Sequence, residues 1–424
     1  MNIFIAIMLI LVGTAVLAQS DGAHEGTLSP AQTSIVRAQQ LIDKNPRDFE
    51  AFNALALALA RRARETSDPN FYTQGEQALQ KSFAISPGNY DGARIGVWLL
   101  LGKHEFAAAR EEASKLNKRV PDDVMVYGFL TDANVELGNY GDAENAAQWM
   151  LNLRPGNLPG LTRAAYLREL FGDNQGALEL MRTALDSTPP GEAEDRAWIT
   201  TQIAHLALAS GKTSEAEHLL QQALGMFPGY HYALSNLGKV RMQQKRYDEG
   251  VALFRQRYEA APHAENLFDL AEALQRAGRT DEASTAFAQF EKKSLAETGR
   301  ADNSNHELIL YYADYAKEPA KALEVALREL ARRHDVFTLD CYAWALHVNG
   351  QDVDARKQIE TALAVGIQDA RLLRHAGEIT LKLGDNTAAQ KYLREAVELN
   401  APESDRARIT LASLSHGGKQ TERR

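Results

Sequence analysis

The sequence has little of the chemistry that disulfides, metals or catalysis require. Its 424 residues include one cysteine, so the chain forms no intrachain disulfide. The eleven histidines are scattered, and no His-x-x-x-His, Cys-x-x-Cys or His-Glu-x-x-His spacing brings metal ligands together. Phosphate-loop and nucleophile-elbow motifs are also missing. These absences predict a protein that is not an enzyme and that holds no metal or cofactor.

Positive charge is also in short supply. The formal net charge is -9, and no run of lysine and arginine stands out locally. Proteins that bind nucleic acid independently of its sequence need many lysine and arginine side chains to contact the phosphates. This class of partner is therefore excluded. Cys341 lies in the apolar stretch FTLDCYAWAL, where a buried and unreactive thiol is expected.

A single long apolar run is present, from Ile3 to Ala18. As a helix it would be about 24 Å long, which is short of the roughly 30 Å hydrocarbon core of a bilayer. The run therefore predicts a signal peptide over residues 1–18, cleaved after Ala18, and an exported protein that is periplasmic or secreted. The alternative is an uncleaved anchor, because no lysine or arginine precedes the run.

Prolines recur at a fixed interval along the rest of the chain. Four of them keep one constant spacing, and after a slip of five positions two more keep the same spacing: Pro87, Pro121, Pro155, Pro189, Pro228 and Pro262. The interval is the one typical of a stack of helix-turn-helix units, roughly 34 residues each. Each proline ends the second helix of a unit, since proline lacks an amide proton and disfavours helix in the residue before it.

Small residues keep the same period. Gly138, Gly172 and Gly211 each lie half a repeat before a proline, where a left-handed turn between two helices is expected. Five positions after each turn comes an alanine, which allows close approach of the helices: Ala143, Ala177, Ala216, Ala283, Ala355 and Ala389. A bulky residue such as Leu220 or Phe254 follows four positions later on the same face.

This pattern resembles the tetratricopeptide repeat from about Arg47 to Pro402. The resemblance implies an all-α fold, a right-handed superhelical solenoid of about ten repeats with capping helices. Ser29-Pro30 predicts the start of the first capping helix, which runs to about Lys44. The expected divisions are a linker and cap over 19–46, repeats 1–7 over 47–293, a loop over 294–302, repeats 8–10 over 303–402, and a cap with a disordered tail over 403–424, in which the cap ends near residue 414.

The ten first helices are expected to begin at definite residues. These are Phe49, Tyr90, Val124, Leu158, Ala197, His231, Ala264, Asn303, Val336 and Ala370. In the family, four positions of each first helix line the concave groove. The resemblance places eight aromatic residues there: Trp98, Tyr166, Trp198, Tyr232, Phe268, Tyr311, Phe337 and Trp344. Trp149 lies on a second helix and is assigned to packing.

Aromatic side chains in a groove are favoured as binding anchors, because they bury much area with little loss of entropy. The alternative is that they pack between adjacent first helices. Charged residues of both signs are interleaved with them: Arg94, Lys239, Arg371, Arg374, Glu169, Glu272, Asp340 and Glu378. We therefore expect a scaffold or adaptor that binds a protein or peptide segment in its groove. The second hypothesis is a receptor or enzyme accessory that binds a small molecule or glycan there.

Overall fold

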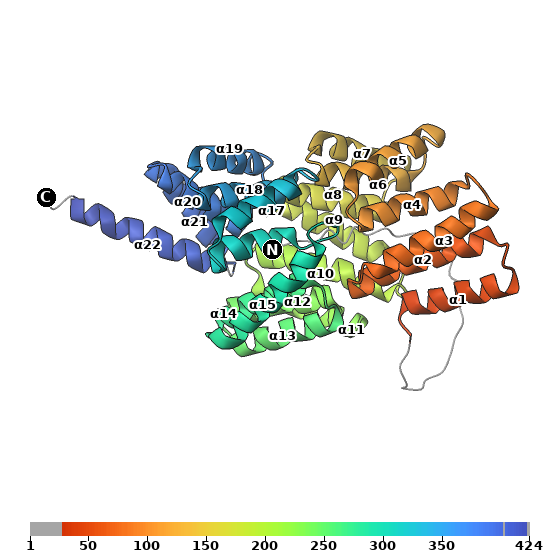
Figure 1. Ribbon diagram of the computed structural model, residues 1–424, viewed down its shortest axis with the longest axis horizontal. Helices are drawn as coiled ribbons and strands as arrows, with labels where there is room; N and C mark the ends of the chain where they lie inside the picture. Colours follow the sequence, from red (N-terminus) through yellow and green to blue (C-terminus); the bar gives the residue numbers. More distant parts are fainter. Residues whose placement is uncertain (1–27, 402, 422–424) are drawn as a thin grey trace. The chain divides into compact units, whose positions relative to one another are not determined.

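The computed structural model describes residues 28–401 and 403–421, and over these residues the chain is built from helices joined by short turns (Figure 1). The predicted signal peptide lies outside the described residues. A first helix is followed by ten helix pairs and a last helix, as the all-α solenoid prediction requires. None of the described helices is long and apolar enough to cross a membrane.

The chain divides into two compact units. The N-terminal unit contains residues 28–134 and 141–163, and the C-terminal unit contains residues 135–140, 164–401 and 403–421. The helices up to the boundary are α1 Pro30–Lys44, α2 Phe49–Thr66, α3 Asn70–Ile85, α4 Tyr90–Gly102, α5 Phe106–Arg119, α6 Val124–Glu136, α7 Tyr140–Leu153 and α8 Leu158–Leu170. The boundary passes through α6, after the first residue of α7, and through α8.

The C-terminal unit continues with α9 Asn174–Ser187, α10 Ala193–Ala209, α11 Thr213–Met226, α12 His231–Gln243, α13 Tyr247–Ala260, α14 Ala264–Arg276, α15 Thr280–Glu297, α16 Asn305–Leu310, the π-helix η1 Tyr311–Tyr315, α17 Pro319–Leu330, α18 Val336–Val348, α19 Asp352–Leu363, α20 Ala370–Lys382, α21 Asn386–Glu398 and α22 Ser404–Thr421. Its largest apolar cluster extends from α12 to α18 around Phe268, Phe290 and Tyr312.

The first helix begins where its capping signal lies. The Ser29 side chain accepts a hydrogen bond from the backbone of Gln32, and the Gln32 side chain accepts one from the backbone of Ser29. Together with Pro30 at the first position, this capping box fixes the start of α1. Glu65 of α2 accepts hydrogen bonds from the Ser29 hydroxyl and the Ala31 amide, which attaches α1 to the first pair.

The predicted repeat register is confirmed. Eight of the ten first helices begin at the expected residue. In the fifth pair, α10 begins at Ala193 instead of Ala197, because the inserted acidic residues Glu194 and Asp195 favour the first turn of a helix. In the eighth pair, α16 begins at Asn305 instead of Asn303, whose side chain caps the turn by accepting from the Asn305 amide.

The turn glycines and the repeated alanines have the conformation and the burial that the sequence pattern predicts. Gly138, Gly172 and Gly211 have φ of 74°, 82° and 74°, a left-handed conformation that favours glycine. The six repeated alanines are completely buried. At Gly238 an added Cβ would lie 2.9 Å from the Phe254 ring, so the bulky side chain occupies the space that the missing one leaves.

Two boundaries differ from prediction. The expected loop over 294–302 is shorter, because α15 continues to Glu297 and the hydroxyl of Ser294, which is buried, bonds that of Ser304 at 2.7 Å. The expected C-terminal cap ends near residue 414, whereas α22 continues to Thr421. No proline interrupts its backbone hydrogen bonding over that stretch.

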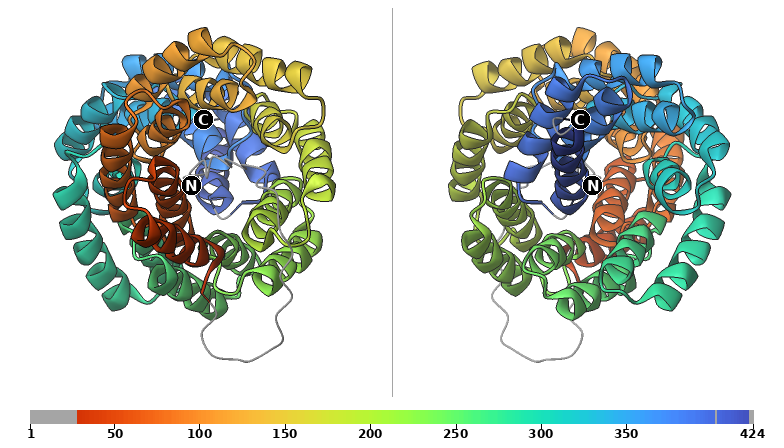
Figure 2. Two further views of the ribbon diagram at one scale, coloured as in Figure 1. Left: turned by 90° about the vertical axis from the view of Figure 1, so that its right-hand side faces the viewer. Right: turned by 90° about the vertical axis from the view of Figure 1, so that its left-hand side faces the viewer.

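The C-terminal unit is held together by contacts between distant repeats. The His334 amide donates to the Glu136 carbonyl at 3.0 Å, and the Val336 amide donates to the Tyr140 hydroxyl at 2.9 Å. Near the end of the chain, the Gln243 side chain of α12 donates to the Asn400 carbonyl at 2.5 Å. In the right-hand view of Figure 2, α22 lies toward the inside of the arc formed by the green and light-blue helices of the same unit.

Candidate functional site

The eight predicted groove aromatics all lie on first helices or on η1, but half of them are buried. Trp98, Trp198, Phe268 and Trp344 are 6%, 6%, 1% and 4% exposed, and the other four are half-buried. Phe268 packs on Phe290 with ring centroids 5.1 Å apart. Burial favours the packing alternative for these four residues, and a role in partner binding stays a prediction for the set.

The assignment of Trp149 to packing is wrong. Its side chain is 52% exposed on α7 of the N-terminal unit and stacks on Tyr127 of α6, with centroids 6.1 Å apart. Cys341 is buried, and burial raises the pKa of its thiol, as expected for an unreactive cysteine.

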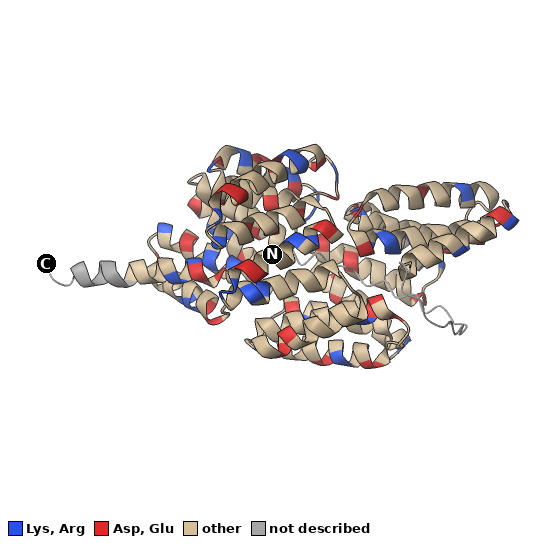
Figure 3. Cartoon of the chain, turned by 90° about the horizontal axis from the view of Figure 1, so that it is seen from below, with Lys and Arg blue, Asp and Glu red and all other residues tan. Residues whose placement is uncertain are grey.

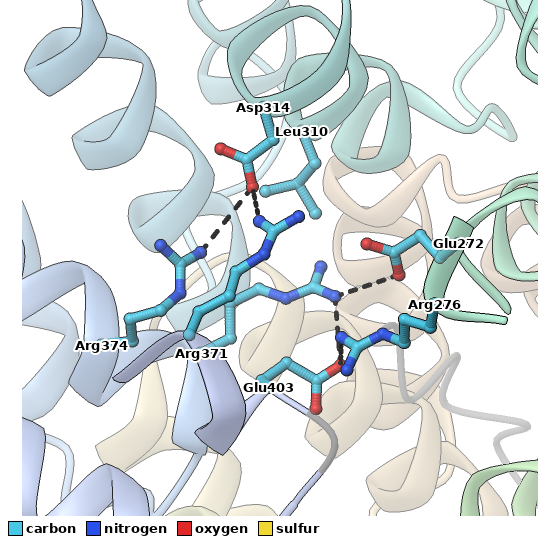
Figure 4. Close-up of a pocket in the computed structure, with 8 residues that line it drawn as sticks. Glu272, Arg276, Leu310, Asp314, Arg371, Arg374 and Glu403 are labelled. Carbon is cyan, nitrogen blue, oxygen red and sulfur yellow. Dashed lines mark hydrogen bonds and ion pairs between the residues drawn. The ribbon is translucent and has the colours of Figure 1, made fainter. Parts of the chain in front are cut away.

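Charged residues of the C-terminal unit meet around a narrow cleft (Figure 4). The residues that line it come from α14, α16, η1, α20 and the start of α22: Glu272, Arg276, Leu310, Asp314, Arg371, Arg374, Glu403 and Arg406. The cleft leaves room for about one water molecule. Three first helices therefore converge on the segment that leads into α22.

Glu403 occupies one side of this cleft. One of its carboxylate oxygens lies 3.5 Å from the Arg371 guanidinium of α20 and 3.7 Å from the Arg276 guanidinium of α14. Arg371 also lies 3.5 Å from Glu272. Burial alone would raise the pKa of Glu403, but Arg276 and Arg371 outweigh it and lower the pKa to about 2. Glu403 is therefore held as a carboxylate.

Arg406 occupies the other side, one helical turn further along. Its guanidinium forms an ion pair with Asp314 and donates to the Tyr315 hydroxyl at 2.9 Å. The Tyr315 hydroxyl in turn donates to Glu272 at 2.7 Å, which links the two sides. Burial raises the pKa of Asp314, but Arg374 and Arg406 have the greater effect and hold it well below its usual range.

The π-helix places Asp314 and Tyr315 in the cleft. In η1 the Ala316 amide donates to the Tyr311 carbonyl, five positions back, so the helix is locally wider than an α-helix. The segment ends at Lys317, with φ of 56°, before Pro319 begins α17. Here the sequence replaces the usual glycine turn, and the altered helix directs two polar side chains toward α20 and α22.

Trp344 packs against this network of ion pairs and hydrogen bonds. Its indole nitrogen donates to Asp314 at 2.9 Å, its ring stacks on His375 with centroids 4.1 Å apart, and the Arg374 guanidinium lies 4.8 Å from the ring. Burial lowers the pKa of His375 well below its usual range, and Arg374 adds to this effect. The histidine is therefore neutral, and its Nδ1 lies 2.6 Å from Asp340.

The cleft holds charged groups in ion pairs. Its carboxylates Glu272, Glu403 and Asp314 each pair with a guanidinium group. Within residues 28–401 and 403–421, no group of histidine, cysteine and acidic side chains is arranged to hold a metal ion. Figure 3 shows acidic and basic residues interspersed along the helices.

Sequence reasoning found part of this site. It named Arg371, Arg374 and Glu272 as charged residues of the groove, and the structure brings all three together. It missed Arg276, Asp314, Glu403 and Arg406. The available signal was the segment Asn400-Ala401-Pro402, which breaks the helix before Glu403 and allows the chain to turn back toward the first helices.

The fold is an α-solenoid, and the charged cleft is lined mainly by its first helices. Tetratricopeptide-repeat models match residues 201–265 and 370–402, so the chain contains tetratricopeptide repeats. No curated protein sequence matches it.

Solved structures share the fold at low identity. A monomeric mutant of IFIT1 with Gppp-AAAA has 15% identity and a TM-score of 0.51, with 87% of this chain and 86% of that chain covered. Yeast Tom70 has 14% identity and a TM-score of 0.35, with 86% and 96% covered. PilW, a type IV pilus biogenesis factor, has 13% identity and a TM-score of 0.41, with 49% and 94% covered. At this identity the likeness to the IFIT1 structure shows the fold alone.

Proposed function

We propose that this protein is a scaffold that binds a segment of a partner protein on the first-helix surface of the C-terminal unit. One observation carries the proposal. Glu403 and Arg406 of the chain itself already lie against that surface, held by oppositely charged side chains of α14, η1 and α20, and Gln243 of α12 donates to the Asn400 carbonyl. A surface with these contacts is suited to a peptide segment that carries charges of both signs.

Lys239 of α12 supports the same surface. It is half-buried on α12, and burial lowers its pKa while the charges of Asp269 and Glu403 act in the opposite direction. In the described part of the chain no hydrogen bond or ion pair engages its ammonium group. A half-buried cation without a carboxylate partner gains from a ligand that supplies one.

Cross-linking in native cells tests the proposal. A photoreactive residue at position 239 is expected to capture a partner that the same residue at position 327 does not, since Leu327 is 50% exposed on the second helix α17. The captured protein is then purified. Lys239→Glu should weaken its binding at least tenfold, because it places a carboxylate next to acidic groups of the cleft.

The matched control is Arg328→Glu, an equal charge change at a partly exposed arginine of α17 that pairs with Glu324. Equal affinities for Lys239→Glu and Arg328→Glu would contradict the proposal. Stabilisation by a sugar or small metabolite in a thermal-shift screen, sensitive to Lys239→Glu, would favour the receptor hypothesis instead.

We also propose that the protein is exported. The proposal rests on the apolar run of residues 3–18 and the small residues Val16 and Ala18 before the expected cleavage site. Intact-mass measurement on protein from the native host should show a chain that begins at Gln19. Recovery of the uncleaved chain in the membrane fraction would contradict it.

A further inference from the structure

The segment that enters α22 presents two charged pairs with the same spacing to opposite environments. Glu403 and Arg406 face the cleft, where they contact Arg276, Arg371, Asp314 and Tyr315. Asp405 and Arg408 are exposed and pair with each other at 2.5 Å, and Arg408 also donates to the Asn400 side chain at 2.7 Å. The two pairs have equal charges and an equal separation of three positions. The difference between them is what each contacts.

We call Glu403 and Arg406 the inner pair, and Asp405 and Arg408 the outer pair. Each residue of the inner pair contacts groups of the opposite charge. The acidic residue lies between two guanidinium groups, and the basic residue three positions later meets a carboxylate and a tyrosine hydroxyl. Glu403 directly precedes α22 and Arg406 lies in its first turn, so the start of this helix supplies both ends of the cleft. The groups that receive them come from α14, η1 and α20, which are first helices of three different repeats.

The apolar contacts of α22 lie elsewhere. Ala407 is buried against Leu373, Leu393 and Ala396 of α20 and α21, with Leu411 and Leu414 at the edge of that cluster. The Ser404 hydroxyl donates to the Ala396 carbonyl at 2.5 Å. These contacts cap the last repeat. The charged contacts of Glu403 and Arg406 reach across to α14 and η1, which the cap itself does not require.

We propose that the segment from Asn400 into α22 is an internal ligand of the first-helix surface, and that the partner is a helical protein segment with an acidic residue followed three positions later by an arginine. This inference rests on the proposed function. The partner's segment replaces Glu403 and Arg406 in the cleft, because both cannot pair with the same guanidinium and carboxylate groups. Binding in trans is therefore in competition with the chain's own segment.

The experiment uses the full chain and a fluorescent peptide that corresponds to residues 400–421. Glu403→Gln with Arg406→Gln removes the charges of the inner pair and leaves Ala407 and the apolar cap unchanged. This variant should bind the peptide at least tenfold more tightly than the unaltered chain does. Asp405→Asn with Arg408→Gln is the matched control, and it should bind the peptide as the unaltered chain does.

Two further measurements test the recognised chemistry. Adding Arg371→Glu to the inner-pair variant should abolish the gain in affinity. A peptide of the same composition with Glu403→Arg and Arg406→Glu reverses the order of the charges and should bind at least tenfold more weakly. Equal affinity of the inner-pair and outer-pair variants, or equal affinity of the two peptides, would overturn the inference.

Failure of the internal-ligand inference can be told apart from failure of the scaffold proposal. If the inner-pair variant gains peptide affinity but no cellular partner is sensitive to Lys239→Glu, the segment is an internal ligand and the scaffold proposal fails alone. If a partner depends on Lys239 but the two variants bind the peptide equally, the scaffold proposal stands. In that case α22 is a cap only.

Discussion

In the N-terminal unit polar contacts join neighbouring repeats, whereas in the C-terminal unit they also join repeats that are far apart in the sequence. Arg163 forms a two-pronged ion pair with Asp132, 31 residues away, and Asn53 bonds Asn89, 36 residues away. In the C-terminal unit, Arg406 reaches Asp314 across 92 residues and Val336 reaches Tyr140 across 196.

The difference bears on how each unit is stabilised. A repeat array with neighbour contacts has a stability close to the sum of local and nearest-neighbour terms. Contacts between distant repeats add terms outside that sum, and they couple the folding of segments that would otherwise respond separately. The C-terminal unit should therefore lose structure over a wider range of repeats when one contact is removed.

The largest effect is expected at Arg333. This half-buried arginine, with its side chain 14% exposed, lies 3.0 Å from Glu136 and 2.7 Å from Asp335, so it joins the third repeat to the ninth. Arg333→Ala leaves both carboxylates without their partner and should cost about 3 to 5 kcal/mol in chemical denaturation. Hydrogen exchange should increase around residues 135–140 and 329–338 together. A change confined to residues 329–338 would contradict the coupling.

The control for Arg333 is Arg168→Ala. Arg168 forms an exposed pair with Asp173 at 2.7 Å. An exposed ion pair contributes about 0 to 1 kcal/mol, so this variant should unfold close to the unaltered chain.

A comparable loss is expected when a buried groove aromatic is removed from either unit. Trp98 in the N-terminal unit and Trp198 in the C-terminal unit are equally buried. Each change to alanine should cost about 3 to 5 kcal/mol. Partner affinity of the folded fraction should be measured on the same variants. A stability loss under about 1 kcal/mol with a marked loss of affinity would restore these residues as binding anchors.

Removing the charge of Glu403 should lower the free energy of unfolding by a smaller amount, which depends on pH. Its pKa is lowered to about 2 from an ordinary value near 4.5, so its contribution is complete above pH about 4.5 and disappears as the pH falls toward 2. Glu403→Gln should cost at most about 3 kcal/mol at pH 7, and the difference from the unaltered chain should shrink on acidification. A difference that grows toward pH 3 would contradict this.

The smallest effect is expected from overpacking of a repeat alanine. Ala216 in the C-terminal unit and Ala143 in the N-terminal unit hold the same position of the repeat, and both are completely buried. Leucine at either site should cost roughly 1 to 3 kcal/mol in chemical denaturation. Hydrogen exchange should place the damage in adjacent repeats for Ala143→Leu and over a wider region for Ala216→Leu. Equal spread in the two variants would remove the distinction between the units.

The helices could be predicted because their signals are local. Prolines, turn glycines and contact alanines act within one repeat. Ser29 and Pro30 likewise define the start of α1 through contacts within its first turn. The charged cleft depends instead on which residues meet after about a hundred intervening positions, as Arg371 and Glu272 do. No spacing rule covers that distance. The π-helix was missed for a related reason, since its sequence YYADY contains no proline or glycine to mark it.

The turn glycines have a mechanical consequence. An added Cβ at Gly138 would lie 2.7 Å from the His334 carbonyl oxygen, and one at Gly172 would lie 2.6 Å from that of Gly366. Backbone therefore rests on backbone between turns that are several repeats apart in the sequence, all within the C-terminal unit. A stack of helix pairs without such contacts stretches under load like a spring. With them, the C-terminal unit should resist a pulling force until these contacts separate, and then extend abruptly.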